Sequence, residues 1–89
     1  MRIKTHKGIK GIIISHYNGV AVKTTMNWTD TLTYTSLLSG LILTAKAKVK
    51  DLDSSNELVF LRVRSKKYEI MVAPDKDYFL IVIQNPDEE

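Results

Sequence analysis

The sequence predicts an α+β domain in which one long helix crosses a face of a five-stranded antiparallel sheet. Three observations predict it: a hairpin signal near the N-terminus, a central stretch of helical periodicity, and three short segments of strand character that follow it. A length of 89 residues is that of one domain, so we expect a single unit over residues 1–89, with residues 86–89 as an acidic tail.

The first two strands are predicted at about residues 9–16 and 20–25. Between them lie Asn18 and Gly19, and this dipeptide favours a type I′ turn, in which both central residues take a positive φ. Gly8 and Gly11 flank the start of the first strand, and one of them is expected to mark a β-bulge or a close approach of backbone.

The central helix is predicted to begin at Thr29 or Asp30, whose side chains offer N-cap oxygens, and to run for about 20 residues to Lys50. Lysines at its end suit the negative end of the helix dipole. On a helical wheel, six residues fall within one arc and are expected to face the sheet. They are Leu37, Leu38, Leu41, Ile42, Ala45 and Val49.

The opposite side of this helix has an unusual composition, because it carries leucines among small residues where charged residues would normally face solvent. A glycine inside a helix costs about 1 kcal/mol relative to alanine, which is easier to understand if another backbone packs against it. This face is therefore predicted to pair with a second helix in a homodimer. A second intramolecular contact, or simple tolerance of the glycine, is the alternative. The predicted residues are Leu32, Ser36, Ser39, Gly40, Leu43 and Ala47.

Three more strands are predicted at residues 58–64, 68–73 and 78–83, and Pro74 begins a type I turn between the last two. The last strand is apolar on both of its faces, so both faces of the sheet should be covered. One helix covers only one face, which again points to a partner chain.

Composition and motifs argue against several classes of function. The chain has no cysteine, a net charge of +3 and no apolar run long enough to span a membrane. Its start lacks the apolar segment of a signal peptide, so a cytoplasmic location is expected. No serine–histidine–aspartate set or phosphate-binding loop is visible, so neither an enzyme nor a cofactor is expected. Alternating Asp51, Asp53, Ser55 and Glu57 resemble the start of a calcium loop, but Arg62 stands at its twelfth position, so no metal is expected.

Basic residues gather around the third predicted strand, namely Arg62, Arg64, Lys66 and Lys67. We interpret them as a solvated edge or an edge that faces a partner. Single-stranded nucleic acid could bind such charges with Phe60 and Tyr68 nearby, and this stays the second alternative. A gel shift that weakens as salt rises would identify it.

Residues 60–86 closely resemble, without a gap, the C-terminal half of roadblock-type dynein light chains. Weaker similarity extends upstream through Gly11-Ile12-Ile13 and residues 50–53. The resemblance implies a roadblock-like fold, a layered domain of the profilin/longin type. Family members usually begin with a further turn or two of helix before the position of Lys7, where this chain has only residues 1–6, so one sheet face is expected to be partly bare.

The resemblance also implies a dimer of the chain with itself or with a roadblock paralogue, in which the long helices pair antiparallel and the two sheets join into one. Phe60, Arg62 and Arg64 are expected at the strand–strand contact or at its rim, in addition to the six helix residues. It further implies a non-catalytic dynein light chain that binds the dynein intermediate chain and lies in the cytoplasm on the microtubule cytoskeleton, with neither nucleic acid nor membrane as partner. A roadblock-like scaffold or regulator of a small GTPase is the alternative.

Overall fold

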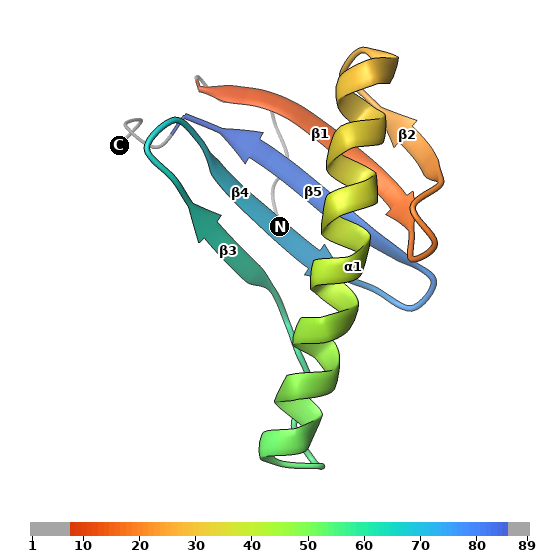
Figure 1. Ribbon diagram of the computed structural model, residues 1–89, viewed down its shortest axis with the longest axis vertical. Coiled ribbons are helices and arrows are strands. Elements are labelled where there is room, and N and C mark those ends of the chain that lie inside the picture. Colours follow the sequence, from red (N-terminus) through yellow and green to blue (C-terminus); the bar gives the residue numbers. More distant parts are fainter. Residues whose placement is uncertain (1–7, 86–89) are drawn as a thin grey trace.

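A computed structural model describes residues 8–85 and places one helix across one face of a five-stranded sheet (Figure 1). The strands lie in the order β2-β1-β5-β4-β3, and all neighbours are antiparallel. This confirms the predicted architecture, while the N-terminal segment and the predicted acidic tail lie outside the described residues. The elements are β1 (Ile9–His16), β2 (Ala21–Thr24), α1 (Trp28–Leu52), β3 (Leu61–Arg64), β4 (Glu69–Pro74) and β5 (Tyr78–Gln84).

The hairpin between β1 and β2 forms as predicted, but its turn is not type I′. Gly19 has a φ of 92°, whereas no non-glycine residue among residues 8–85 has a positive φ, so Asn18 does not meet the type I′ requirement. The amide of Gly19 donates to the carbonyl of His16 at 2.9 Å, and the amide of His16 donates to the carbonyl of Val20 at 2.9 Å. The loop therefore has three residues, and glycine supplies the left-handed position at its end.

Gly11 marks both a bulge and a close approach. The pairing of β1 with β5 shifts register between Ile9 and Gly11. The side chain of Met26 occupies the space that a Cβ at Gly11 would need. Any larger residue at position 11 would displace that methionine, which is one of the side chains packed against the core.

The N-cap of α1 is Asn27, two residues before the earliest predicted cap, and the helix runs for 25 residues to Leu52. The Oδ1 atom of Asn27 accepts from the amide of Asp30 at 2.8 Å, and its Nδ2 donates to the Asp30 carboxylate at 3.1 Å. Thr29 and Asp30 thus lie inside the first turn. Asp30 still contributes there, because a carboxylate suits the positive end of the helix dipole.

Replacing Asn27 with alanine should lower the free energy of unfolding by about 1 kcal/mol, because the amide of Asp30 loses its acceptor. Thermal or urea unfolding measures this loss. Asn27→Ser should restore most of it, and Thr29→Ala should change little. Equal losses for Asn27→Ala and Thr29→Ala would contradict the position of the cap.

The side chains by which α1 packs on the sheet differ from the predicted arc. Leu38 and Ile42 are buried as expected, but Leu37 and Leu41 lie on the outward side, 69 % and 42 % exposed. Two threonines take their place in the core. The buried residues of α1 are Thr31, Thr35, Leu38 and Ile42.

The buried threonines are tolerated because their hydroxyls have partners. The Oγ1 atoms of Thr24 and Thr31 lie 2.8 Å apart, and Thr35 donates to the carbonyl of Leu32 at 3.4 Å within the helix. A buried hydroxyl with a hydrogen bond avoids most of the cost of desolvation. Polar residues therefore occupy the contact between α1 and the hairpin, and leucines are left outside.

The third strand is shorter than predicted, because β3 begins at Leu61 and not at residue 58. Its pairing with β4 runs from Leu61 opposite Val72 to Arg64 opposite Glu69. Beyond Leu61 the ladder would reach Pro74, whose ring nitrogen has no hydrogen to donate. The segment with Val59 and Phe60 consequently runs along the sheet without joining it.

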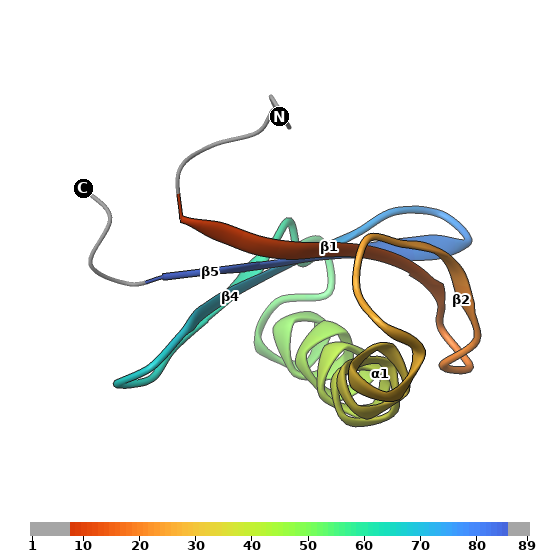
Figure 2. The same cartoon turned by 90° about the horizontal axis from the view of Figure 1, so that it is seen from above.

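One face of the sheet carries α1, and no other helix lies within residues 8–85 to cover the second face (Figure 2). Side chains alternate along β5, so Phe79, Ile81 and Ile83 point into the core beneath α1. Leu80 and Val82 point to the opposite face. No element within residues 8–85 covers this second face, on which these two apolar side chains of β5 lie.

Candidate protein-interaction site

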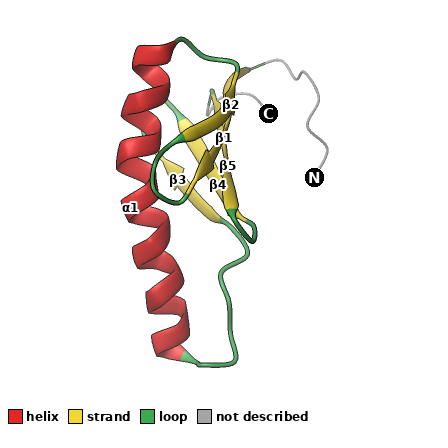
Figure 3. Ribbon diagram, turned by 90° about the vertical axis from the view of Figure 1, so that its right-hand side faces the viewer, coloured by secondary structure: helices red, strands yellow, loops and turns green. Residues whose placement is uncertain are grey.

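The outward face of α1 is apolar and unoccupied. Figure 3 shows α1 alone on its side of the sheet, with its C-terminal half extending past the strands. No residue of α1 after Ile42 is buried. Four leucines on this side are between 42 % and 69 % exposed, namely Leu32, Leu37, Leu41 and Leu43. An exposed apolar stripe of this kind is typical of an interaction surface.

Small residues form the centre of this face. Ser36, Gly40 and Ala47 are all exposed. A Cβ built on Gly40 would meet no atom of another element within 4 Å, so no contact among residues 8–85 explains the glycine. Small residues flanked by larger apolar ones let another helix approach closely, with the leucines packing on either side.

The structure places five of the six predicted helix residues on this outward face. The sixth, Ser39, is partly buried at its margin, and its Oγ lies 3.6 Å from where a Cβ on Gly19 would stand. Leu37 and Leu41 also belong to the face, although the helical wheel predicts them on the side that faces the sheet. The face of α1 that packs on the sheet is marked by four residues at helical spacing, namely Thr31, Thr35, Leu38 and Ile42. Two of these are threonines, which hydrophobicity alone does not assign to a core.

The edge strand β3 carries two arginines on the face of the sheet opposite α1. Arg62 pairs across the ladder with Met71, and Arg64 pairs with Glu69. The Nε of Arg62 lies 3.3 Å from Oε2 of Glu69, whose other oxygen accepts from the side chain of Gln84 at 3.1 Å. Both oxygens of this buried carboxylate are thus engaged.

The bare sheet face contains an apolar groove next to β3. Its volume is about 320 Å³, and its lining is formed entirely by apolar residues, namely Val59, Phe60, Met71, Ala73, Leu80 and Val82. A second hollow shares Ala73 and Leu80 with it and extends towards Ile14 and Tyr78. Phe60 lines the groove and lies 5.9 Å from the Arg62 guanidinium, so the apolar groove and the charged edge adjoin.

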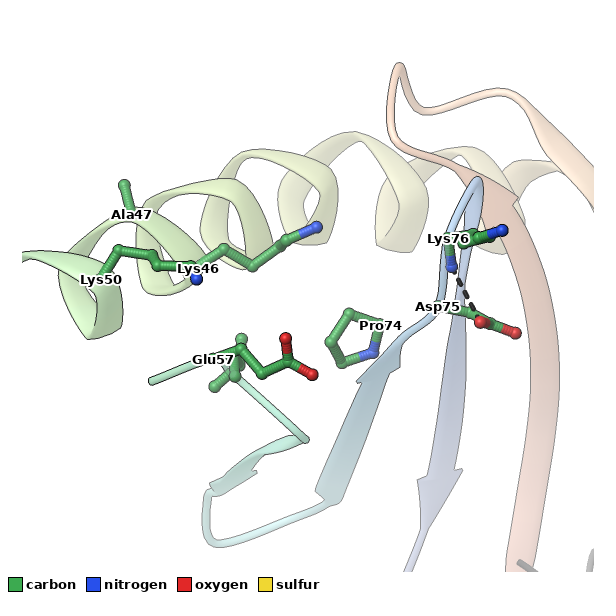
Figure 4. Close-up of a pocket in the computed structure, with 8 residues that line it drawn as sticks. Lys46, Ala47, Lys50, Glu57, Pro74, Asp75 and Lys76 are labelled. Atoms are coloured by element: carbon green, nitrogen blue, oxygen red, sulfur yellow. Dashed lines mark hydrogen bonds between the residues drawn. The ribbon is translucent and has the colours of Figure 1, made fainter. Parts of the chain in front are cut away.

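A larger and more polar hollow lies between α1 and the β4–β5 turn (Figure 4). Its two helix lysines already have partners. The Nζ of Lys46 lies 4.4 Å from the ring centroid of Tyr17, and Lys50 donates to the carbonyl of Ser54 at 3.3 Å. Tyr17 also donates its hydroxyl to the carbonyl of Asp75 at 2.5 Å. The contacts of Lys46 and Tyr17 link α1 to the β1–β2 loop and the β4–β5 turn, so we assign the hollow a structural role.

The titratable groups with a shifted pKa have structural causes. Burial, followed by the nearby Tyr68 and Asp30, raises the pKa of Tyr34. Hydrogen bonds from the backbone and hydroxyl of Ser55 lower the pKa of Asp53, which caps the end of α1. That carboxylate is therefore part of a turn.

Other site types find no support in the described part of the chain. Among residues 8–85, no group of three or more histidine, aspartate or glutamate side chains is placed to hold a metal ion. The helix found there lacks the apolar length to cross a membrane. His16 packs against Tyr78, with ring centroids 5.0 Å apart. The features described above, namely the outward face of α1, the β3 edge and the apolar groove, are typical of surfaces that bind another protein.

Comparison with known proteins agrees with this fold. A Roadblock/LC7 domain from Streptomyces avermitilis has a TM-score of 0.86 at 10 % identity, over 93 % of this chain and 71 % of its own. MglB from Myxococcus xanthus has a TM-score of 0.74 at 19 % identity, over 91 % of this chain and 68 % of its own. An MglB structure with a tetrameric arrangement has a TM-score of 0.75 at 10 % identity, over 86 % and 60 %.

At such low identities these structures establish the fold. The family follows from the sequence itself, because the family model for the Roadblock/LC7 domain matches residues 1–85. This confirms the resemblance on which the roadblock-like fold was predicted. The chain belongs to the Roadblock/LC7 domain family.

Proposed function

We propose that this chain is a non-catalytic scaffold that pairs with a second roadblock-domain chain and, as a pair, docks a small GTPase in the cytoplasm. The observation that carries the pairing is the outward face of α1, where four exposed leucines flank small residues. A chain of 89 residues buries on the order of 60–65 % of its unfolded surface, so covering those leucines would add needed stability.

The second proposed contact is the free side of β3, which is the last strand of the sheet. Pairing of two such edges would satisfy backbone groups that otherwise face solvent and would join the sheets. The tetrameric arrangement of one MglB structure supports association between roadblock domains in general. Both surfaces come from consecutive elements, because β3 follows α1 in the chain and the C-terminal half of α1 extends past the ends of the strands (Figure 1).

The groove on the bare face is the proposed docking place for the third protein. It is apolar, adjoins the β3 edge and would be doubled in a pair of chains. A groove of this volume accepts a few apolar side chains from a partner, typically from an amphipathic helix. A small GTPase, the alternative that the resemblance left open, is proposed as that partner because the similar structures named above are a Roadblock/LC7 domain from Streptomyces avermitilis and MglB proteins, and none of these is a dynein light chain. These neighbours fit the small-GTPase alternative at least as well as the dynein one.

A dynein light chain is the second candidate, and the close resemblance of residues 60–86 to roadblock-type dynein light chains favours it. In that case the docked segment belongs to the dynein intermediate chain. The two candidates share the paired scaffold and differ only in what it holds.

The purified chain should bind one or more members of a panel of small GTPases, presented with GDP and with a non-hydrolysable GTP analogue. A dynein intermediate-chain peptide is tested in parallel. Binding of the peptide alone would establish the second candidate, and binding of neither would contradict docking of both kinds.

A variant in the groove makes this test specific. Leu80→Lys should abolish docking, because it puts a charge in the middle of an apolar groove. Its pairing with a second chain should persist, since Leu80 lies on a central strand. Val22→Lys, at an exposed position of the edge strand β2, is the matched control and should bind normally.

A further inference from the structure

The apolar groove has one lining side chain that ordinary chemistry can make polar. Of its six lining residues, Met71 alone carries an atom that a peroxide oxidises readily, namely its thioether sulfur. Met71 lies on β4 opposite Val82 of β5, which also lines the groove, and it is only partly buried. Oxidation converts this sulfur into a sulfoxide, whose oxygen is polar. The apolar character of the groove therefore depends on the oxidation state of one side chain.

Arg62 lies next to this sulfur. Its Nη2 is 3.8 Å from the sulfur of Met71, across the β3–β4 ladder. A thioether sulfur is a weak acceptor, whereas a sulfoxide oxygen at that place would accept a charge-assisted hydrogen bond. The Nε of the same guanidinium lies 3.3 Å from the Glu69 carboxylate, and Nη2 can donate to the new oxygen while that contact persists. The fold can thus accommodate the oxidised side chain.

Met26 is the other methionine of the described residues, and its surroundings differ. Its side chain packs against the core and occupies the space next to Gly11. An added oxygen would crowd that contact, and overpacking a filled site destabilises a fold. Met26 is therefore expected to resist oxidation in the folded chain, while Met71 is open to peroxide from the groove.

We infer that Met71 is a site of reversible oxidation by hydrogen peroxide, and that its sulfoxide closes the groove to apolar partners. A sulfur lone pair attacks one peroxide oxygen, an S–O bond forms as the O–O bond breaks, and the other oxygen leaves as water. The sulfur loses the two electrons that reduce the peroxide. Methionine sulfoxide reductases reverse the step, in which two thiols give a disulfide and the sulfoxide oxygen leaves as water. This inference rests on the proposed docking at the groove and adds its regulation.

Closure follows from the cost of removing water from a polar group. An apolar side chain that enters the groove must displace water from the sulfoxide oxygen and from the Arg62 guanidinium beside it. Such a loss of hydration lowers affinity by about tenfold or more. The domain itself keeps its stability, because the new oxygen has a hydrogen-bond donor within the fold.

Peptide mass mapping of the full chain after mild peroxide treatment tests the site. The Met71 peptide should gain the mass of one oxygen atom while the thermal unfolding temperature stays unchanged. Met26 should be oxidised at a comparable rate only after urea unfolds the chain. Met71→Leu is the matched control, since it keeps the groove apolar and leaves the other methionines in place.

Fluorescence of the uncharged apolar dye Nile red tests closure without any partner protein. The difference between wild type and Leu80→Lys defines the signal of the groove. If Leu80→Lys does not fold, Val59→Lys replaces it, because Val59 lines the groove and is 72 % exposed. Peroxide should abolish this signal in wild type, and a methionine sulfoxide reductase with dithiothreitol should restore it. Met71→Leu should keep the signal in peroxide, whereas Met71→Gln should lack it without peroxide.

Adverse results separate the inference from the proposed function. If Met71 is oxidised no faster than Met26 in the folded chain, or if its sulfoxide leaves the Nile red signal unchanged, the oxidation switch is overturned. Equal dye binding by wild type and the lysine variant would overturn closure as well. If the dye responds to Met71 oxidation while no small GTPase or intermediate-chain peptide binds the reduced chain, the proposed docking partners are wrong and the oxidation site stands.

Discussion

Replacing Gly40 with arginine is expected to yield a folded chain that no longer pairs through α1. The site lies at the centre of the outward face, and a Cβ built there would meet no atom of another described element within 4 Å. Folding should not suffer, because arginine is a better helix former than glycine. In a pair, each arginine would have to fit between closely packed helices, at a cost of about 1–3 kcal/mol per site. A hundredfold rise in Kd is of this order.

Gly40→Ala is the matched control for this variant. A single methyl group should raise the free energy of unfolding by about 1 kcal/mol and leave pairing within a few-fold of wild type. Sedimentation equilibrium and thermal unfolding of the three chains measure both quantities. An arginine variant that sediments as a dimer would show that the helices do not meet at Gly40.

Ile42 and Leu43 are adjacent residues for which opposite outcomes are expected. Ile42 has no exposed surface, whereas Leu43 is 47 % exposed on the outward face. Ile42→Ala should cost about 2–5 kcal/mol, because it leaves a cavity between the helix and the sheet. That is a large fraction of the stability of a small domain, about 5–15 kcal/mol, so much of this variant should be unfolded at 37 °C.

Leu43→Ala should leave the stability of the single chain within about 0.5 kcal/mol of wild type. It should instead weaken pairing by about tenfold, since it removes a leucine side chain from the proposed contact. Urea unfolding at several protein concentrations separates the two effects. If the loss in free energy of unfolding depended on protein concentration for Ile42→Ala and not for Leu43→Ala, our assignment of the two faces would be reversed.

The elements of the fold could be predicted because their signals are local. The apolar, β-branched segments of β1 and β5 and the uninterrupted helical stretch from Thr29 to Lys50 each select a backbone conformation through near neighbours. The predicted strands of the β1–β2 and β4–β5 hairpins agree with the structure to within one residue at each end. The resemblance of residues 60–86 then identified the family, which the family model confirms.

Predictions that depended on contacts between distant residues were less accurate. The N-cap moved to Asn27, and β3 lost its first three predicted residues because Pro74 cannot extend the ladder. The helix wheel assigned Leu37 and Leu41 to the core on hydrophobicity alone. Their true position depends on where α1 crosses the sheet, which local periodicity does not specify.

Alternation and composition along the chain thus sufficed to establish a sheet, a long helix and a surplus of apolar surface. Packing in the folded chain then decided which apolar residues stay exposed. Thr31 can be buried because Thr24 lies across from it on β2, and the burial of that pair turns the leucines outward. Likewise, Arg62 and Glu69 are seven residues apart in sequence, and only the β3–β4 ladder brings them to 3.3 Å. Pairwise contacts of this kind are made by the folded chain, so no single segment encodes them.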